Sequence, residues 1–171
     1  MKVTIKMWFS TQSGIRMINR NSALVIREAT LDDAQLYFEW VNDPVVRQMA
    51  FHTEPIPWEN HIKWFSSKAA SSKTQLLLCY CQDHPIGQVR FDILEGGEAE
   101  IDISIAKDFR AKGYGKKMLI TALEYERREY GVTVFVSEVK EENISSQRMF
   151  LSSGFNFLKK EDGVCYYQKN L

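Results

Sequence analysis

The sequence lacks an excess of charge of either sign and has few residues that break regular structure. Its 171 residues include 22 Lys and Arg against 22 Asp and Glu, so the formal net charge at pH 7 is zero. No general electrostatic field then favours nucleic acid or an anionic membrane, and a cationic site must be local. Only nine Gly and four Pro occur, whereas 44% of the residues are hydrophobic, which predicts one compact domain with a sizeable core.

Long hydrophobic runs and cysteine are also scarce. No stretch approaches the roughly 18 consecutive apolar residues of a membrane span, and residues 1–22 lack the apolar centre of a secretory signal. We therefore expect a cytoplasmic protein without a membrane partner. Cys79, Cys81 and Cys165 are odd in number, and we interpret them as buried thiols rather than as a disulfide or a metal site. The three histidines show no metal-ligand spacing, so no metal is expected.

Periodicity predicts an α/β domain over residues 23–171, preceded by an N-terminal extension of weak structure over residues 1–22. Strands are expected where apolar and β-branched residues cluster or alternate, and helices where apolar residues recur at helical spacing between capping and breaking residues. The expected strands are 24–27, 74–81, 85–94, 99–105, 132–137, 155–159 and 164–168. The expected helices are 30–42, 44–51, 58–68, 115–130 and 144–153.

The segment that says most about function joins the strand 99–105 to the helix 115–130. It is an Arg-x-x-Gly-x-Gly turn made of Arg110, Ala111, Lys112, Gly113, Tyr114 and Gly115, followed by Lys116 and Lys117. Glycine has no side chain to keep a phosphate away, and the first N–H groups of a helix lack backbone acceptors and carry the positive end of its dipole. The turn therefore predicts a pyrophosphate site, although two glycines also occur in turns that bind no ligand.

Two other nucleotide motifs do not fit this turn. A P-loop requires Gly-x-x-x-x-Gly-Lys-Ser/Thr, but Arg110 stands at the first glycine and Lys117 at the hydroxyl residue. A dinucleotide fold requires a third glycine, which Lys116 and Met118 do not supply. The turn belongs to neither class.

In its order of strands and helices, with this turn after the fourth strand, the chain resembles the GCN5-related N-acetyltransferase (GNAT) superfamily. A second segment agrees, because residues 143–155 are similar to that family's Asn-x-x-Ser-x-x-x-Tyr-x-x-x-Gly-Phe motif. The resemblance covers about Leu24 to the C-terminus. It implies an α/β (α+β) fold with a mixed, mostly antiparallel twisted sheet of about seven strands, flanked by about four helices and splayed between the fourth and fifth strands.

The same resemblance implies an acetyl-CoA-dependent N-acetyltransferase whose partner is a small-molecule amine. The pyrophosphate of acetyl-CoA would lie on the turn, and its pantetheine would pair with the backbone of the strand 99–105 as an added strand does. The cofactor-binding residues expected from the resemblance are Ile103, Ser104, Ile105, Arg110, Ala111, Lys112, Gly113, Tyr114, Gly115, Lys116, Asn143, Ser146 and Phe150. For Asn143, the alternative is that it only caps a helix.

Phe150 departs from the family pattern, because many relatives carry there a Tyr that donates a proton to the departing thiolate, and a phenyl ring cannot donate. Thiols have a pKa of about 8.5, so the thiolate can leave without an acid. Ser146, Tyr125, Tyr166 or water would substitute. The alternative is a non-catalytic regulator that binds acetyl-CoA without transferring the acetyl group.

The reaction also needs a base, because an alkylammonium must lose a proton before its nitrogen attacks a thioester. Glu100 and Asp102 lie two residues apart on one face of the strand 99–105, and either is a candidate. The alternative is that they form a solvated strand face. The catalytic candidates are therefore Glu100, Asp102 and Ser146.

The acceptor site is expected, by the resemblance, mainly in the segment 40–51. The further segments 56–65 and 86–92 resemble the branch that acetylates nucleotide-linked amino sugars, as in pseudaminic-acid-type pathways. A diphosphate and a flat base need guanidinium donors and aromatic faces. The candidates are Trp40, Asn42, Arg47, Phe51, His61, Trp64 and Arg90, with core packing as the alternative for the aromatic residues.

The segment Trp40-Val41-Asn42-Asp43-Pro44 leaves the choice of acceptor open. The pattern Trp-x-Asn-Asp-Pro also occurs in the branch that acetylates the N-termini of ribosomal proteins. A protein N-terminus or another small amine is therefore the alternative acceptor. The sequence also leaves the oligomeric state open, since an exposed edge strand would permit a homodimer.

Overall fold

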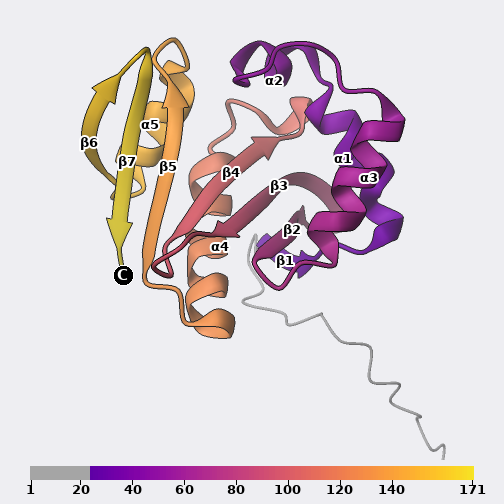
Figure 1. Cartoon of the computed structure of the whole chain (residues 1–171), viewed down its shortest axis with the longest axis horizontal. Coiled ribbons are helices and arrows are strands. Elements are labelled where there is room, and N and C mark those ends of the chain that lie inside the picture. The colour runs from indigo at the N-terminus through magenta and orange to yellow at the C-terminus, as the bar shows by residue number, and fades with distance from the viewer. Residues whose placement is uncertain (1–23) are drawn as a thin grey trace, which may run out of the picture.

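The computed structural model describes residues 24–171, so the expected extension over residues 1–22 lies outside the described part. One seven-stranded sheet in the order β1-β2-β3-β4-β5-β7-β6 forms its centre (Figure 1). The strands are β1 (Leu24–Glu28), β2 (Thr74–Cys81), β3 (His84–Ile93), β4 (Ala99–Ile105), β5 (Val134–Lys140), β6 (Asn156–Glu161) and β7 (Val164–Asn170). The helices are α1 (Ala34–Val41), α2 (Pro44–Met49), α3 (Trp58–Ala69), α4 (Tyr114–Tyr130) and α5 (Ile144–Ser152), with short 3-10 turns at Leu31–Asp33 and Lys107–Phe109.

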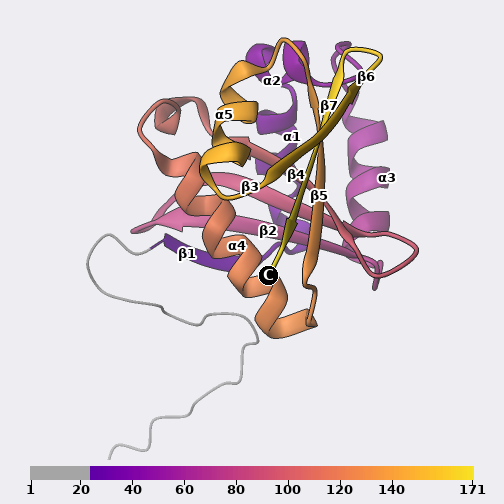
Figure 2. The same cartoon turned by 90° about the vertical axis from the view of Figure 1, so that its left-hand side faces the viewer.

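The sheet carries a core on each face, and the sequence of β2 shows why. Leu76 and Leu78 are buried in the cluster that includes α1 and α3, whereas Leu77 and Cys79 are buried in the larger cluster beneath α4. Successive side chains of a strand point to opposite faces, so an unbroken apolar run makes a strand that is covered on both sides. Figure 2 shows α4 and α3 on opposite sides of the strands.

β4 and β5 form the one parallel pair of the sheet, and they separate soon after they meet. Only two register pairs join them, Ala99 with Phe135 and Glu100 with Val136. Beyond these pairs β4 stays bonded to β3 and β5 to β7, so within residues 24–171 the two edges that face each other have no strand partner. The expected splay between the fourth and fifth strands is confirmed.

The expected fold class is also confirmed, but some expected bounds were wrong. Residues 24–171 contain five α-helices, one at each of the five predicted positions. β5 begins at Val134 rather than at residue 132, because Gly131 ends α4 with a φ of 74° and Val132 packs into the core before the strand pairing starts. It runs on to Lys140 because it pairs with β7 as far as Val164. The helix expected at 44–51 ends at Met49, since Ala50 is extended.

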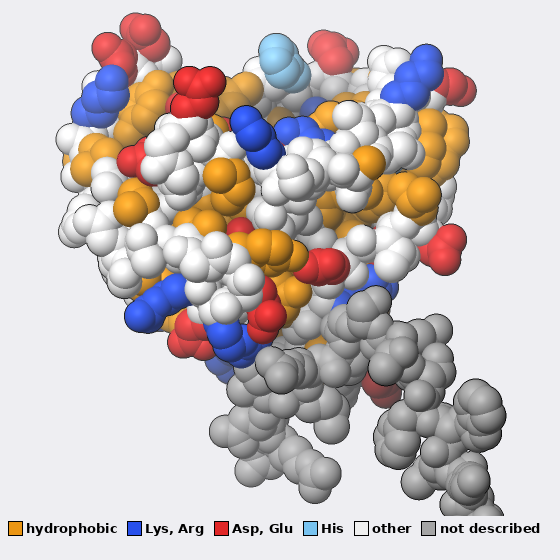
Figure 3. Space-filling model, turned by 60° about the horizontal axis from the view of Figure 1, so that its bottom comes forward, with side chains coloured by type: hydrophobic (Ala, Val, Ile, Leu, Met, Phe, Trp, Pro, Cys, Tyr) orange, Lys and Arg blue, Asp and Glu red, His pale blue; other side chains and the backbone are white. Residues whose placement is uncertain are grey.

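The surface and the cysteines agree with the composition. In the view of Figure 3, acidic and basic side chains lie beside one another and form no large field of one sign. Cys79 and Cys165 are buried free thiols, and Cys81 is a half-buried one. Within residues 24–171 no helix has the length and apolar character to cross a bilayer.

Candidate functional site

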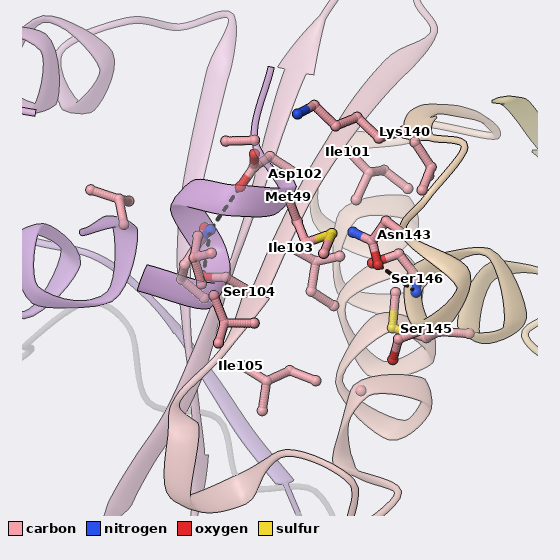
Figure 4. Close-up of a pocket in the computed structure, with 18 of the residues that line it drawn as sticks. Met49, Ile101, Asp102, Ile103, Ser104, Ile105, Lys140, Asn143, Ser145 and Ser146 are labelled. Carbon is pink, nitrogen blue, oxygen red and sulfur yellow. Dashed lines mark hydrogen bonds between the residues drawn. The ribbon is translucent and has the colours of Figure 1, made fainter. Parts of the chain in front are cut away.

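A cavity of about 990 Å³ opens where β4 and β5 separate. Residues 101–105 of β4 and 137–140 of β5 line it, together with the turn before α4, the start of α5, and the α2–α3 region. In Figure 4, Ile103, Ser104 and Ile105 lie on one side of this space, and Asn143, Ser145 and Ser146 lie on the other. The separation of the two strands therefore creates a cleft edged by unpaired backbone.

The turn before α4 gives its two glycines different roles. Gly113 caps α4 in the left-handed region with a φ of 80°, and a Cβ there would meet nothing within 4 Å. A Cβ on Gly115 would lie 2.8 Å from Ile105 Cδ1 and 2.9 Å from Met149 Sδ. The sequence interpretation gave both glycines the same role, but in the structure Gly113 leaves open space, whereas Gly115 lets α4 pack closely on β4 and α5.

Arg110 ties this turn to α2. Its Nη1 lies 2.9 Å from Asp43 Oδ1, and its Nε donates to the Ile105 carbonyl at 2.9 Å. Asp43 also accepts the N–H groups of Val45 and Val46 and so caps α2. Although burial opposes it, the hydrogen bond from Arg110 lowers the pKa of Asp43.

Not every predicted residue of the turn reaches the cavity. Those that line it are Arg110, Ala111, Gly113, Gly115 and Lys116. The Lys112 ammonium instead lies 5.9 Å from the centre of the Phe109 ring, and Tyr114 packs on Phe109 and contacts the Cys81 thiol. Lys112 and Tyr114 therefore contribute to the turn itself rather than to the cavity wall.

The donors present fit a pyrophosphate-bearing cofactor such as acetyl-CoA. The start of a 17-residue helix faces the cavity, with no side chain on Gly113 or Gly115 to block it and with Lys116 beside it. The open edges of β4 and β5 offer backbone groups to the amides of a pantetheine arm. The turn would hold the phosphates and the strand edges the arm.

The start of α5 forms the opposite wall. Asn143 Oδ1 accepts the Ser146 N–H at 3.1 Å, so Asn143 is an N-cap, and both residues line the cavity. Phe150 borders the cavity but is buried, with ring centres 5.0 Å from Phe155 and 5.9 Å from Tyr167.

Of the side chains expected to replace a tyrosine at position 150, Ser146 alone borders the cavity. Tyr125 donates to Glu28 near the C-terminal end of α4, and Tyr166 is absent from the cavity wall. Ser146 is thus the remaining side-chain donor of that set, and its role as an acid stays a prediction.

Asp102 and Glu100, the two candidate bases, lie in different surroundings. Asp102 lines the cavity with half of its side chain exposed. Glu100 lies at the register pair with Val136, where β4 and β5 are still joined, and is not part of the cavity wall. Burial and the neighbouring Glu138 raise the pKa of Glu100. The structure therefore brings Asp102, and not Glu100, to the open part of the cleft.

Arg47 and Arg90, the two arginines predicted to bind a diphosphate, both line the cavity but already have partners. Arg47 donates from Nε to the Val41 carbonyl at 2.5 Å and from Nη1 to the His52 carbonyl at 3.0 Å. Burial lowers the pKa of Arg47. These two bonds hold the chain around α2 together, and they leave three of the five N–H donors of the Arg47 guanidinium for other partners.

Arg90 stands between an aromatic ring and two carboxylates. Its guanidinium carbon lies 5.5 Å from the centre of the Trp64 ring, its Nε lies 2.8 Å from Asp92 Oδ2, and its Nη2 lies 3.8 Å from Asp102 Oδ2. Although burial opposes it, Asp102 and Asp92 raise the pKa of Arg90. Its charge is thus largely balanced within the protein.

The other predicted acceptor residues divide into cavity and core. Phe51 and Trp64 line the cavity, and the Phe51 side chain is more than half exposed. Trp40 packs beside the buried cluster of α1 and α3 and does not reach the cavity, so core packing is its role. Asn42 bridges to Ile56, accepting its N–H at 2.8 Å and donating to its carbonyl at 3.0 Å.

His61 borders the cavity yet is buried among aromatic rings. Its Nε2 lies 2.9 Å from the Ala34 carbonyl oxygen, and its ring centre lies 5.4 Å from that of Phe38 and 5.7 Å from that of Trp64. Burial lowers the pKa of His61, so the neutral ring that donates to Ala34 is the stable form. His61 mainly joins α1 to α3.

Several polar residues of the cavity wall were missed by sequence reasoning, among them Gln88, Glu54 and Lys140. Gln88 interrupts an apolar strand, and an amide at a buried strand position is itself a sign of a specific hydrogen bond. Lys140 Nζ donates to the Gln48 carbonyl at 3.3 Å and so links β5 to α2. No local pattern in the sequence indicates this contact between Lys140 and Gln48, which lie far apart in the chain.

The phosphate turn can be tested with two glycines of one helix. Gly113→Val is expected to weaken CoA binding at least about tenfold, because a β-branched residue is strained in the left-handed region and its methyl groups enter the space above the turn. Gly131→Val is the control, since Gly131 caps the other end of α4 with a φ of 74° and also has nothing within 4 Å. Both variants should lose similar stability, so a difference in CoA affinity, measured by isothermal titration, reports on the turn alone. Equal CoA affinity in the two variants would disprove the assignment of the turn.

Comparison with known proteins identifies the family to which the chain is similar. Residues 23–156 match the family model described as the acetyltransferase (GNAT) domain. The chain is 26% identical over 162 residues to the uncharacterized protein MJ1062 of Methanocaldococcus jannaschii, an alignment that covers 91% of this chain and 33% of that protein. The chain thus spans about a third of the length of that relative.

Solved structures of similar fold include a domain from Methanocaldococcus jannaschii, with a TM-score of 0.76, 25% identity, and coverage of 88% of this chain and 100% of that one. Spermidine N-acetyltransferase from Vibrio cholerae with CoA and spermine gives a TM-score of 0.76 at 18% identity, covering 88% and 96% of the two chains. Aminoglycoside acetyltransferase AAC(6')-Ib with coenzyme A gives 0.75 at 17% identity, covering 86% and 95%. At these identities the last two show a shared fold.

Proposed function

Because this chain belongs to the acetyltransferase (GNAT) domain family, we propose that it is an acetyl-CoA-dependent N-acetyltransferase acting on a primary amine of a small molecule. One observation carries the proposal. A single cavity joins the open glycine turn of α4, the unpaired edges of β4 and β5, and the half-exposed Asp102 carboxylate. A phosphate site, a path for the pantetheine arm and a proton acceptor thus lie in one cleft.

In the proposed reaction, amine and thioester meet beside β4 in a ternary complex. Asp102 takes a proton from the ammonium, directly or through a water, and the freed nitrogen forms the new N–C bond while the C–S bond breaks. The second proton that the nitrogen loses goes to the departing thiolate, which leaves as free CoA thiol. The thiolate can leave without a tyrosine at position 150, since its conjugate acid has a pKa of about 8.5. Much of the rate increase comes from holding the two reactants in register.

For the acceptor we propose a small cationic amine. Glu54 and Asp102 line the acceptor side of the cavity, while the guanidinium groups of Arg47 and Arg90 are bonded within the protein. Proteins of the same fold include enzymes named for spermidine and for aminoglycosides. This support favours an amine over an anionic acceptor.

A nucleotide-linked amino sugar is the second candidate. Phe51 and Trp64 provide aromatic faces at the cavity on which a base can stack. Its diphosphate would bind the N–H groups of Arg47 that remain beyond the bonds to Val41 and His52, since Arg90 is already paired with Asp92. A protein N-terminus as acceptor stays a prediction, and so does a homodimer.

Release of free CoA thiol from acetyl-CoA tests these alternatives. The amine panel contains spermidine, an aminoglycoside, a free amino sugar, a nucleotide-linked amino sugar and an N-terminal peptide. We expect turnover with the cationic amines that is unchanged when a nucleotide is added. Turnover with the nucleotide-linked sugar alone would support the second candidate, and silence with every amine despite CoA binding would identify a non-catalytic regulator.

A further inference from the structure

Gln88 lies on β3 beside the proposed acceptor site. It pairs in register with Ser104 of β4, lines the cavity, and is only 3% exposed. Its Nε2 donates to Asp102 Oδ1 at 2.8 Å and to Ser104 Oγ at 3.2 Å. A buried amide is costly unless it is hydrogen-bonded, so these contacts fix the orientation of the Gln88 side chain.

The bond from Gln88 matters because Asp102 has little else to hold it. Within residues 24–171 it is the one hydrogen bond to the Asp102 carboxylate, since the Arg90 guanidinium stands 3.8 Å away. A half-exposed aspartate without such a partner would sample several rotamers, and binding the substrate ammonium would cost the entropy of fixing one of them. Held by Gln88, the carboxylate keeps one position, which Figure 4 shows beside the cavity with the bond drawn as a dashed line.

We infer that Gln88 is a positioning residue of the acceptor site, which holds the Asp102 carboxylate toward the incoming ammonium. The inference rests on the proposed function and deepens it, because it names a determinant of amine binding on a strand that carries no catalytic candidate. Arg90 has a different role. It also pairs with Asp92 and stacks on Trp64, so it supports the packing of α3 on the sheet as well.

Gln75 provides a matched control. It lies on the neighbouring strand β2, is 7% exposed, and, like Gln88, has a buried Oε1 without a hydrogen-bond partner in the described part of the chain. It lines a separate hollow of about 260 Å³ with Glu28 and Tyr130 and does not border the large cavity. Gln75→Leu and Gln88→Leu therefore make the same chemical change at similar burial, but only the second reaches Asp102.

The test is a double-mutant cycle on Gln88→Leu and Asp102→Asn. Steady-state kinetics with the best amine of the panel give kcat and both KM values, and calorimetry with CoA present gives the affinity for the same amine. We expect Gln88→Leu to lower kcat/KM for the amine about tenfold and to leave the KM for acetyl-CoA within about twofold. In Asp102→Asn, adding Gln88→Leu should cost no more than about a further twofold, because the two residues act as one unit. Gln75→Leu should change neither kinetic parameter.

Each outcome separates the inference from the function on which it rests. The role of Gln88 would be overturned if the losses in kcat/KM multiply in the double variant, or if Gln75→Leu shows an equal loss. Thiol release by the wild type would still support an enzyme in either case. If the wild type binds the amine but releases no thiol, the proposed function fails, and a tenfold loss of amine affinity in Gln88→Leu alone still supports the inference. Equal amine affinity in the wild type and Gln88→Leu would overturn it.

Discussion

Replacing Asp102 with Asn is expected to lower kcat with the amine acceptor by about 100-fold or more, the usual contribution of a general base. The change keeps the shape of the side chain, and its amide oxygen can still accept the Gln88 bond, but it removes the proton acceptor from the cavity. CoA affinity should stay within about twofold, since the phosphate turn is untouched. Thiol release at saturating acetyl-CoA measures kcat, and titration with CoA measures binding.

Glu100→Gln is the matched control for this prediction. Glu100 is on the same strand and the same face, two residues away, but lies where β4 and β5 are paired and outside the cavity wall. Its kcat should therefore stay within about threefold of the wild type. A loss of activity in Glu100→Gln, with Asp102→Asn active, would move the base to position 100.

The difference between these two carboxylates shows what sequence could predict and what it could not. Alternation placed Glu100 and Asp102 on one face of a strand, and this local property held. The point at which β4 leaves β5 depends on how β5 pairs with β7, a contact between segments far apart in the chain. The sequence therefore predicted both candidates, and only tertiary structure separated them.

The acceptor residues illustrate the same limit. Residue type indicated that Arg47 and Arg90 can bind an anion, but their internal partners appear only in the fold: the carbonyls of Val41 and His52 for Arg47, and carboxylates of β3 and β4 for Arg90. The glycine turn depends on local signals: the sequence predicted a helix starting at residue 115, and the structure starts α4 at Tyr114, directly after a left-handed cap at Gly113 that was not predicted. The sequence predicted local backbone structure, but it could not predict whether a charged side chain already has hydrogen-bond partners within the protein.

α2 connects the turn before α4 to β5, which no sequence motif predicted. Its N-terminus is held to the phosphate turn through Asp43 and Arg110, and its C-terminus to β5 through Gln48 and Lys140. The turn before α4 and the end of β5, on the proposed cofactor and acceptor sides of the cleft, thus both contact one short helix. Substitutions at either contact should change both KM values together, unlike substitutions at Gln88.

Glu126→Gln is expected to stabilise the protein above neutral pH. Glu126 lies on the core-facing side of α4 near Ala122 and Leu123, has no exposed surface, and neither of its carboxylate oxygens has a hydrogen-bond partner among residues 24–171. Burial, with a smaller contribution from Glu28, raises the pKa of Glu126 to about 7 from an ordinary value of 4.5. The folded state therefore prefers the protonated carboxyl.

The sign of the pH dependence follows from this preference for the proton. Below about pH 4.5 both states of Glu126 are protonated, and its contribution to stability is fully present. As the pH rises from there toward about 7, the unfolded state releases the proton first, so the free energy of unfolding falls. The loss from this one group is about 3 kcal/mol once the folded carboxyl is also ionised.

Glutamine resembles the protonated carboxyl in size and cannot ionise, so Glu126→Gln should match the wild type near pH 5 and exceed its unfolding free energy by about 2 kcal/mol at pH 8. Urea unfolding at both pH values measures the difference, in which the titration of the other groups cancels. Glu124→Gln, at an exposed position of the same helix, should change stability by less than about 0.5 kcal/mol at either pH. A gain that is the same at pH 5 and pH 8, or a loss at pH 8, would show that Glu126 is not held protonated in the core, and the buried face of α4 would then need a partner for its charge.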